Sequence, residues 1–173
     1  RDYDTNTAST VYFRFLIRLT SDTLDDGDFS TGFLDYNGPN MGYRDNVNPG
    51  DMFARLSPTV YANSGTLSND TTYLLIGKLE RSSGTYKDIS FWVNPGAGDS
   101  NSPDATASIG TGVADFSTFG LRVGTGNESE DQVVYDEIVI GTEWGDVIPE
   151  PFSVGLLGIG GLLACVLRRM QRR

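Results

Sequence analysis

Four aspartates crowd one short stretch of the sequence around a single glycine. They are Asp22, Asp25, Asp26 and Asp28, within SDTLDDGD. Carboxylate oxygens at short spacing beside a glycine suit a hard cation such as Ca²⁺. The spacing does not match the ligand positions of an EF-hand loop, and an acidic loop is more often only solvated. The stretch is therefore a calcium-binding candidate, with an exposed acidic loop as the simpler interpretation.

A few aromatic side chains are candidates for carbohydrate recognition. Trp92, Tyr36 and Tyr43 combine flat apolar faces with polar atoms, which suits stacking on sugar rings. Trp92 lies inside a strand-like run, so it is also a candidate core residue. Trp144 follows the last strand-like run and is expected to pack over an end of the fold.

Catalysis has less support than binding. The chain has no histidine, and its only cysteine, Cys165, lies in an apolar C-terminal stretch. Ser-His-Asp and Cys-His catalysis and histidine-ligated zinc are therefore excluded from these residues. Two carboxylates such as Glu137 and Glu143 would suffice for glycoside hydrolysis, but the compact Glu-x-Asp-x-x-Glu strand motif of glucanases is absent. We expect a non-catalytic body with no required cofactor.

Charge is divided unevenly along the chain. The formal net charge is −10; residues 150–173 hold four arginines and one glutamate, giving +3, so the rest of the chain carries −13. An acidic body repels phosphate backbones, so nucleic-acid binding is not expected. The chain starts at Arg1 without an apolar leader, so we expect an upstream part to be missing.

The elements that must position these residues are β-strands. In Val11–Leu19, VYFRFLIRL, apolar residues fall on one face while Arg14 and Arg18 fall on the other, which predicts a half-buried strand. Residues 1–147 are expected to form one antiparallel β-sandwich or jelly roll with negligible helix. Residues 29–43 allow a short hairpin or a ligand-facing loop, and residues 94–112 are expected to form a loop. The other strand-like runs are Tyr73–Glu80, Ile89–Val93, Phe119–Val123 and Val133–Ile140.

The C-terminal residues 148–173 have a different character. Pro149, Glu150 and Pro151 precede sixteen uncharged residues, Phe152–Leu167. As a helix these would span roughly 24 Å, enough for a membrane that thins slightly. The arginines that follow predict a cytoplasmic C-terminus; they are Arg168, Arg169, Arg172 and Arg173. A permanent anchor and a buried core helix are the alternatives.

This order of motif, short span and terminal arginines resembles the PEP-CTERM sorting signal. The resemblance implies export, transient residence in the inner membrane, and processing by exosortase near Pro149-Glu150-Pro151. The run from Tyr135 to Trp144, YDEIVIGTEW, is similar to the closing strand of concanavalin A-like (laminin G-like) jelly rolls. The resemblance implies binding of carbohydrate, protein or calcium, or a fold with no known ligand, so the fold does not decide the function. We expect a cell-surface or matrix protein whose partners are an exosortase-type enzyme, the membrane and an extracellular polysaccharide. The alternative is an extracellular glycan-active enzyme with its catalytic residues upstream.

Overall fold

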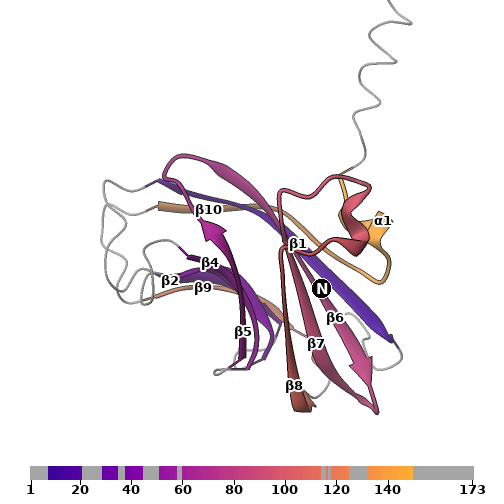
Figure 1. Ribbon diagram of the computed structural model, residues 1–173. Helices are drawn as coiled ribbons and strands as arrows, with labels where there is room; N and C mark the ends of the chain where they lie inside the picture. Colours follow the sequence, from indigo (N-terminus) through magenta and orange to yellow (C-terminus); the bar gives the residue numbers. More distant parts are fainter. Residues whose placement is uncertain are drawn as a thin grey trace, which may run out of the picture.

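In this computed structural model the chain forms two five-stranded sheets that pack face to face (Figure 1). The structure describes residues 8–20, 29–34, 38–44, 51–57, 60–113, 116, 118–124 and 132–149. Every strand pairing in this part is antiparallel, which confirms the predicted all-β sandwich. Sheet A has the order β10 (Gln132–Gly141), β1 (Thr10–Thr20), β6 (Thr72–Ser82), β7 (Thr85–Val93) and β8 (Ala105–Val113). Sheet B has the order β5 (Val60–Thr66), β4 (Asp51–Ser57), β3 (Asn40–Arg44), β2 (Phe29–Leu34) and β9 (Phe119–Val123).

The core lies between the sheets and is organised around β1. Phe13, Phe15 and Ile17 are fully buried there, as their alternation predicts. Two glycines make room for the phenylalanine rings. A Cβ on Gly32 of sheet B would lie 2.4 Å from the Phe15 ring, and one on Gly77 would lie 2.5 Å from the Phe13 ring. The phenylalanine rings therefore occupy the space that a side chain at position 32 or 77 would need.

The five strands that the sequence predicts are all present. Four lie close to the expected bounds, whereas β7 begins earlier than expected, at Thr85 rather than Ile89. Residues 29–43 contain the hairpin β2–β3, one of the two alternatives. The expectation of a loop for residues 94–112 is wrong in its second half, where β8 pairs with β7 and Ala107 lies opposite Ile89. Small residues can form an edge strand because the ladder hydrogen bonds come from the backbone.

Arg18 is exposed, as the period-two pattern of β1 predicts. Arg14, which the same pattern predicts to be exposed, is mostly covered. The side chain of Arg14 is only 11% exposed. It donates to the Val147 carbonyl at 3.0 Å, so a segment from the far end of the body covers it. The alternation gave the correct face of β1 but could not reveal what packs on that face.

Helix is scarce in the described part of the chain, which agrees with the prediction. It consists of the 3₁₀ turn η1 (Asp99–Asn101) and the short helix α1 (Trp144–Val147). Trp144 packs beside Trp92 on the outer face of sheet A rather than over an end of the sandwich. Within the residues described, no helix has the length and apolar character needed to cross a membrane. The expected span, residues 152–167, lies outside that part.

Candidate functional site

The outer face of sheet B carries a set of polar and aromatic side chains from all five of its strands. Strand register places Phe33, Asn40 and Arg55 in one row, and Thr31, Phe53 and Asn63 in the next, with Arg122 beside Thr31. A third row pairs Arg44 with Asp51. The residues between them on the same strands, such as Met41 and Ala54, belong to the core. We call this set the sheet B face: Thr31, Phe33, Asn40, Arg44, Asp51, Phe53, Arg55, Asn63 and Arg122.

Arg44 is held at the centre of contacts on this face. Its guanidinium carbon lies 5.2 Å from the centre of the Phe53 ring, a cation–π arrangement. Its Nη2 donates to Asn63 Oδ1 at 3.3 Å. Arg44 is 9% exposed and Phe53 is fully buried, whereas Asn63 is exposed. The contacts thus run from a buried ring to the surface.

Asn40 adds a buried acceptor to the sheet B face. The residue is 2% exposed, and its Nδ2 donates to the Gly38 carbonyl at 3.2 Å. In the part of the chain that the structure describes, its Oδ1 is buried without a hydrogen-bond partner. An unpartnered buried oxygen costs about 1–3 kcal/mol, which a donor group of a ligand would recover.

The aromatic residues expected to stack on sugars are buried instead. Trp92 is 1% exposed and donates its indole N–H to the Asp99 carbonyl at 2.9 Å. Tyr43 is fully buried, because its position on β3 points into the core. The expectation of an exposed ring face is therefore wrong for both. Tyr36 lies outside the described residues.

The predicted calcium ligands Asp22, Asp25, Asp26 and Asp28 also lie outside the described residues. Within the part that the structure describes, no group of three or more acidic, histidine or cysteine side chains is placed to hold a metal ion.

The two glutamates considered for hydrolysis have separate structural partners. Glu137 lies 3.4 Å from the Arg14 guanidinium, and Glu143 takes part in the capping box of α1. Each carboxylate is thus engaged with a neighbouring element of the fold.

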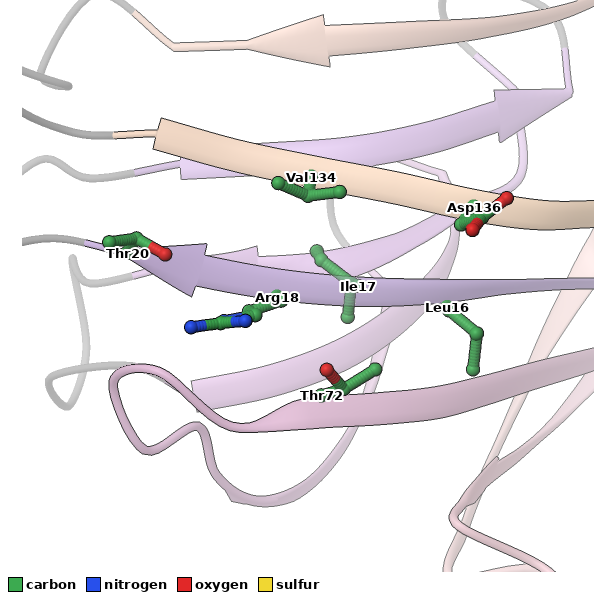
Figure 2. A pocket seen from close by; sticks show the side chains of 7 residues that line it. All are labelled: Leu16, Ile17, Arg18, Thr20, Thr72, Val134 and Asp136. Carbon is green, nitrogen blue, oxygen red and sulfur yellow. The ribbon is translucent and has the colours of Figure 1, made fainter.

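A shallow hollow of about 350 Å³ lies on the outer face of sheet A, across three strands (Figure 2). Its apolar floor includes Leu16 and the 52% exposed Val134, and its charged members are Arg18 and Asp136. Asp136 accepts a hydrogen bond from the Glu137 N–H at 2.7 Å. The remaining lining comes from Ile17, Thr20 and Thr72.

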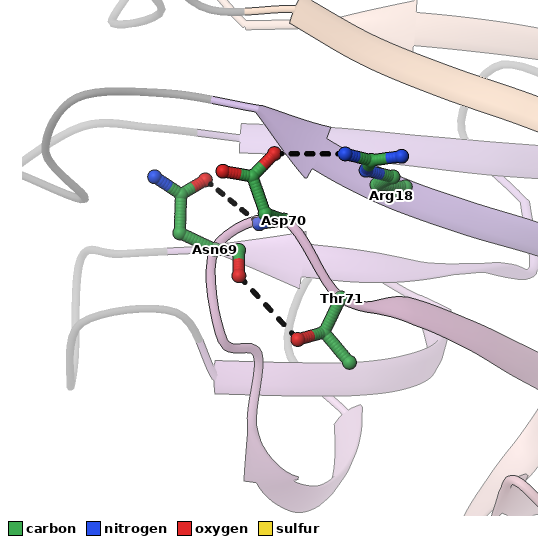
Figure 3. Close-up of polar contacts among 4 residues, drawn as sticks. All are labelled: Arg18, Asn69, Asp70 and Thr71. Carbon is green, nitrogen blue, oxygen red and sulfur yellow. Dashed lines mark hydrogen bonds and ion pairs between the residues drawn. The ribbon is translucent and has the colours of Figure 1, made fainter.

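The cation of this hollow is held by a turn at its edge (Figure 3). Arg18 Nη2 donates to Asp70 Oδ1 at 3.0 Å. This bond, followed by one to Thr20, lowers the pKa of the Asp70 carboxyl below its ordinary value. The Asp70 N–H donates to Asn69 Oδ1 at 3.2 Å, and Thr71 Oγ1 donates to the Asn69 carbonyl at 3.4 Å. Both charged groups of the hollow have hydrogen-bond partners within the fold. Among the described residues, the sheet B face gathers more polar side chains and includes the unpartnered Asn40 oxygen, so it is the stronger candidate.

Sequence reasoning missed the sheet B face because its signal is spread over several short strands. In NMGYR and DMFARLS the apolar residues alternate with polar ones. That alternation indicates strands with one face in the core, but each run is short and contains only a few matches. Only the register between strands brings Asn40, Arg44 and Arg55 onto one face.

No family model matches the chain, and no curated protein matches its sequence. Solved structures of similar fold include the following two. One is a functionally unknown protein from Saccharomyces cerevisiae, at 13% identity and a TM-score of 0.52, covering 79% of this chain and 71% of that chain. The other is an endo-β-1,4-glucuronan lyase from the fungus Trichoderma reesei, at 18% identity and a TM-score of 0.49, covering 86% of this chain and 76% of that chain. The likeness to the yeast protein concerns the fold alone.

Proposed function

We propose that this protein is a non-catalytic, exported surface or matrix protein whose body binds glycans through the sheet B face. The observation that carries the proposal is the arrangement around Arg44, which lies over Phe53 and donates to the exposed Asn63. The buried Asn40 oxygen supplies an acceptor in a neighbouring row. Guanidinium and amide groups donate and accept the hydrogen bonds that sugar hydroxyls make. The buried Phe53 ring supports the Arg44 guanidinium from below and does not itself offer a stacking face.

The charges on the sheet B face favour an acidic glycan. Among the residues that the structure describes, the face holds Arg44, Arg55 and Arg122 together with the carboxylate of Asp51, whereas the body as a whole carries −13. Arginine presents a planar fork of donors that matches a carboxylate or sulfate. The acidic remainder of the body would repel the same ligand, which directs it to this face.

Strand connectivity supports a jelly roll of the concanavalin A-like kind. The chain enters sheet A with β1, forms four strands of sheet B, returns to sheet A for β6–β8, and ends with β9 in sheet B and β10 in sheet A. The terminal strands β1 and β10 are neighbours. This crossing between sheets brings both ends of the body to one sheet, as in jelly rolls.

The surface location is proposed from the C-terminal residues. Pro149-Glu150-Pro151 would mark where an exosortase-type enzyme acts, residues 152–167 would enter the membrane, and the terminal arginines would remain in the cytoplasm. The exposure of Pro149 in the structure is compatible with access by such an enzyme.

Binding of neutral and acidic oligosaccharides to the full chain in detergent tests the glycan proposal. We expect binding to oligouronates or sulfated glycans, weakened about tenfold by Arg122→Ala, because one charge-assisted hydrogen bond is worth about 1.5–3 kcal/mol. Arg18→Ala removes an exposed arginine from the opposite sheet and should leave binding unchanged.

The possible outcomes test three points separately: the location of the site, the binding of glycans, and the alternative of a glycan-active enzyme. Equal weakening by the two variants would show that the sheet B face is not the site. Absence of binding to every glycan would contradict the function itself. Cleavage of a bound glycan, seen as new chain ends, would favour the alternative of a glycan-active enzyme.

A further inference from the structure

Residues 142–148 form a compact turn directly after β10. Asp146 Oδ2 accepts the backbone N–H groups of Thr142 and Glu143, each at 2.9 Å, which closes the turn at the start of α1. A Cβ on Gly141 would lie 2.4 Å from Asp146 Cβ, so the close approach requires glycine there. The turn is therefore defined by hydrogen bonds and a close approach within residues 141–146.

The turn packs on the outer face of sheet A and builds a second small core. The Trp144 ring lies 5.0 Å from Trp92 and 6.0 Å from Tyr12, and its indole N–H donates to the Ala97 carbonyl at 3.0 Å. Val147 is fully buried beside Ile76. These contacts join the end of the body to β1, β6, β7 and the segment after β7.

Arg14 adds polar contacts that help to hold residues 142–148 on sheet A. Its Nη1 donates to the Val147 carbonyl at 3.0 Å, and its Nη2 lies 3.4 Å from Glu137 Oε2. Glu137 has a φ of 47° and lies at an irregularity in the β1–β10 pairing. A left-handed backbone at a residue other than glycine costs about 1–3 kcal/mol. The fold therefore tolerates both a mostly buried charge and local strain where the segment is held.

The packing of this segment on sheet A ends within the two residues after Val147. The Ile148 N–H donates to the Trp144 carbonyl at 3.1 Å, and its side chain is half-buried against the second core. Pro149 is exposed. The change from a fully buried to an exposed residue thus takes two positions, from Val147 to Pro149.

We propose that residues 142–148 act as a latch that sets the C-terminal boundary of the body for peptide-cleaving enzymes. An enzyme must bind its substrate in an open conformation, so bonds inside a docked segment are cut only through local unfolding. Peptide bonds from Pro149 onward lie outside residues 142–148, so their cleavage does not require these residues to unfold. The boundary follows from the contacts of the latch, and it holds whether or not an exosortase processes this chain.

Limited proteolysis of the full chain in detergent, with a protease that prefers apolar residues, tests the latch. We expect wild-type cuts within residues 142–148 to be at least tenfold slower than cuts in an unstructured peptide of the same sequence. Arg14→Ala should speed the cuts within the latch about tenfold, because the carbonyl of Val147 loses its donor. Arg18→Ala, on the same strand but exposed, should leave the rate of cuts within the latch unchanged.

Two further measurements keep the proposal testable if Arg14→Ala fails to fold. Trp144→Ala should open the latch without leaving a charged group of sheet A unpaired. Hydrogen exchange of the wild-type Ile148 amide should be at least tenfold slower than that of an unstructured peptide. Rapid wild-type cutting within residues 142–148, or a wild-type Ile148 amide that exchanges freely, would overturn the latch.

Discussion

Tyr135 connects the two sheets at the level of single side chains. Its hydroxyl, on β10, is hydrogen-bonded to Ser30 Oγ on β2, and Ser30 Oγ also donates to the Arg122 carbonyl at 3.1 Å. The Tyr135 ring meets Phe15 edge-on at 5.2 Å. Burial raises the pKa of the Tyr135 phenol above its ordinary value, and the bond to Ser30 opposes that rise only in part. The neutral phenol is thus the form that the fold stabilises.

Tyr135→Phe should change the response of stability to alkaline pH. At neutral pH the variant loses one hydrogen bond and about 0.5–1.5 kcal/mol. A raised folded pKa means that the stability contribution is complete below the ordinary pKa of tyrosine and is lost as pH rises through the raised value. The wild type should therefore lose about 1.4 kcal/mol per pH unit more than the variant in that window. Urea unfolding at neutral and alkaline pH measures this, and parallel pH curves for the two proteins would contradict it.

At the scale of elements, the sequence predicts the strands with strong apolar alternation and misses those without it. β1 repeats large apolar residues at every second position, so its type and its buried face follow directly. In β8, ATASIGTGV, the residues Ala105, Ala107 and Ile109 alternate with exposed ones and pack partly buried against the core. Two of these three side chains are small, so the alternation is too weak to distinguish the strand from a loop. Arg14 differs for another reason: its partner Val147 lies 133 residues away, beyond any local periodicity.

The candidate site shows the same limit. Trp92 and Tyr43 are chemically suited to stacking on a sugar, but residue type does not state which face of a strand is covered. Asn40 and Arg44 reach the outer face of sheet B through the register of β3 with β2 and β4. Strand order and register come from the whole chain, so the sheet B face became visible only in three dimensions.

Close packing between elements makes a specific demand on Gly77 of β6. An added Cβ would lie 2.5 Å from Phe13 Cε1, so Gly77→Ala should force the ring to move and destabilise the body by about 1–3 kcal/mol. Gly110 lies on β8, where an added Cβ meets no atom within 4 Å. Gly110→Ala should change stability by less than about 0.5 kcal/mol. Urea denaturation of the two variants measures the difference in stability. Equal effects would show that the contact with Phe13 does not require glycine at position 77.

At the scale of the whole molecule, the two outer faces of the sandwich differ. That of sheet A is partly covered by residues 142–148, which pack on Tyr12, Ile76 and Trp92. That of sheet B carries three arginines in an otherwise acidic body. The chain leaves the latch at Pro149, on the side of sheet A. A body held through its C-terminal end would therefore keep the sheet B face directed away from that attachment.

The last prediction concerns the fate of the C-terminal residues in a host that contains an exosortase. The acidic body and the cluster that ends in Arg173 carry charges of opposite sign, and basic residues after an apolar span resist translocation. We therefore expect the intact chain to stay with the inner membrane in a host that lacks the enzyme. In the exosortase-bearing host, mass spectrometry should find a mature C-terminus close to Pro149-Glu150-Pro151, and Glu150→Ala should restore the intact terminus. The latch predicts a second result in the same mass spectrum, namely that no abundant product should end before Pro149. Recovery of Arg173 as the dominant C-terminus in that host would instead identify an ordinary membrane anchor.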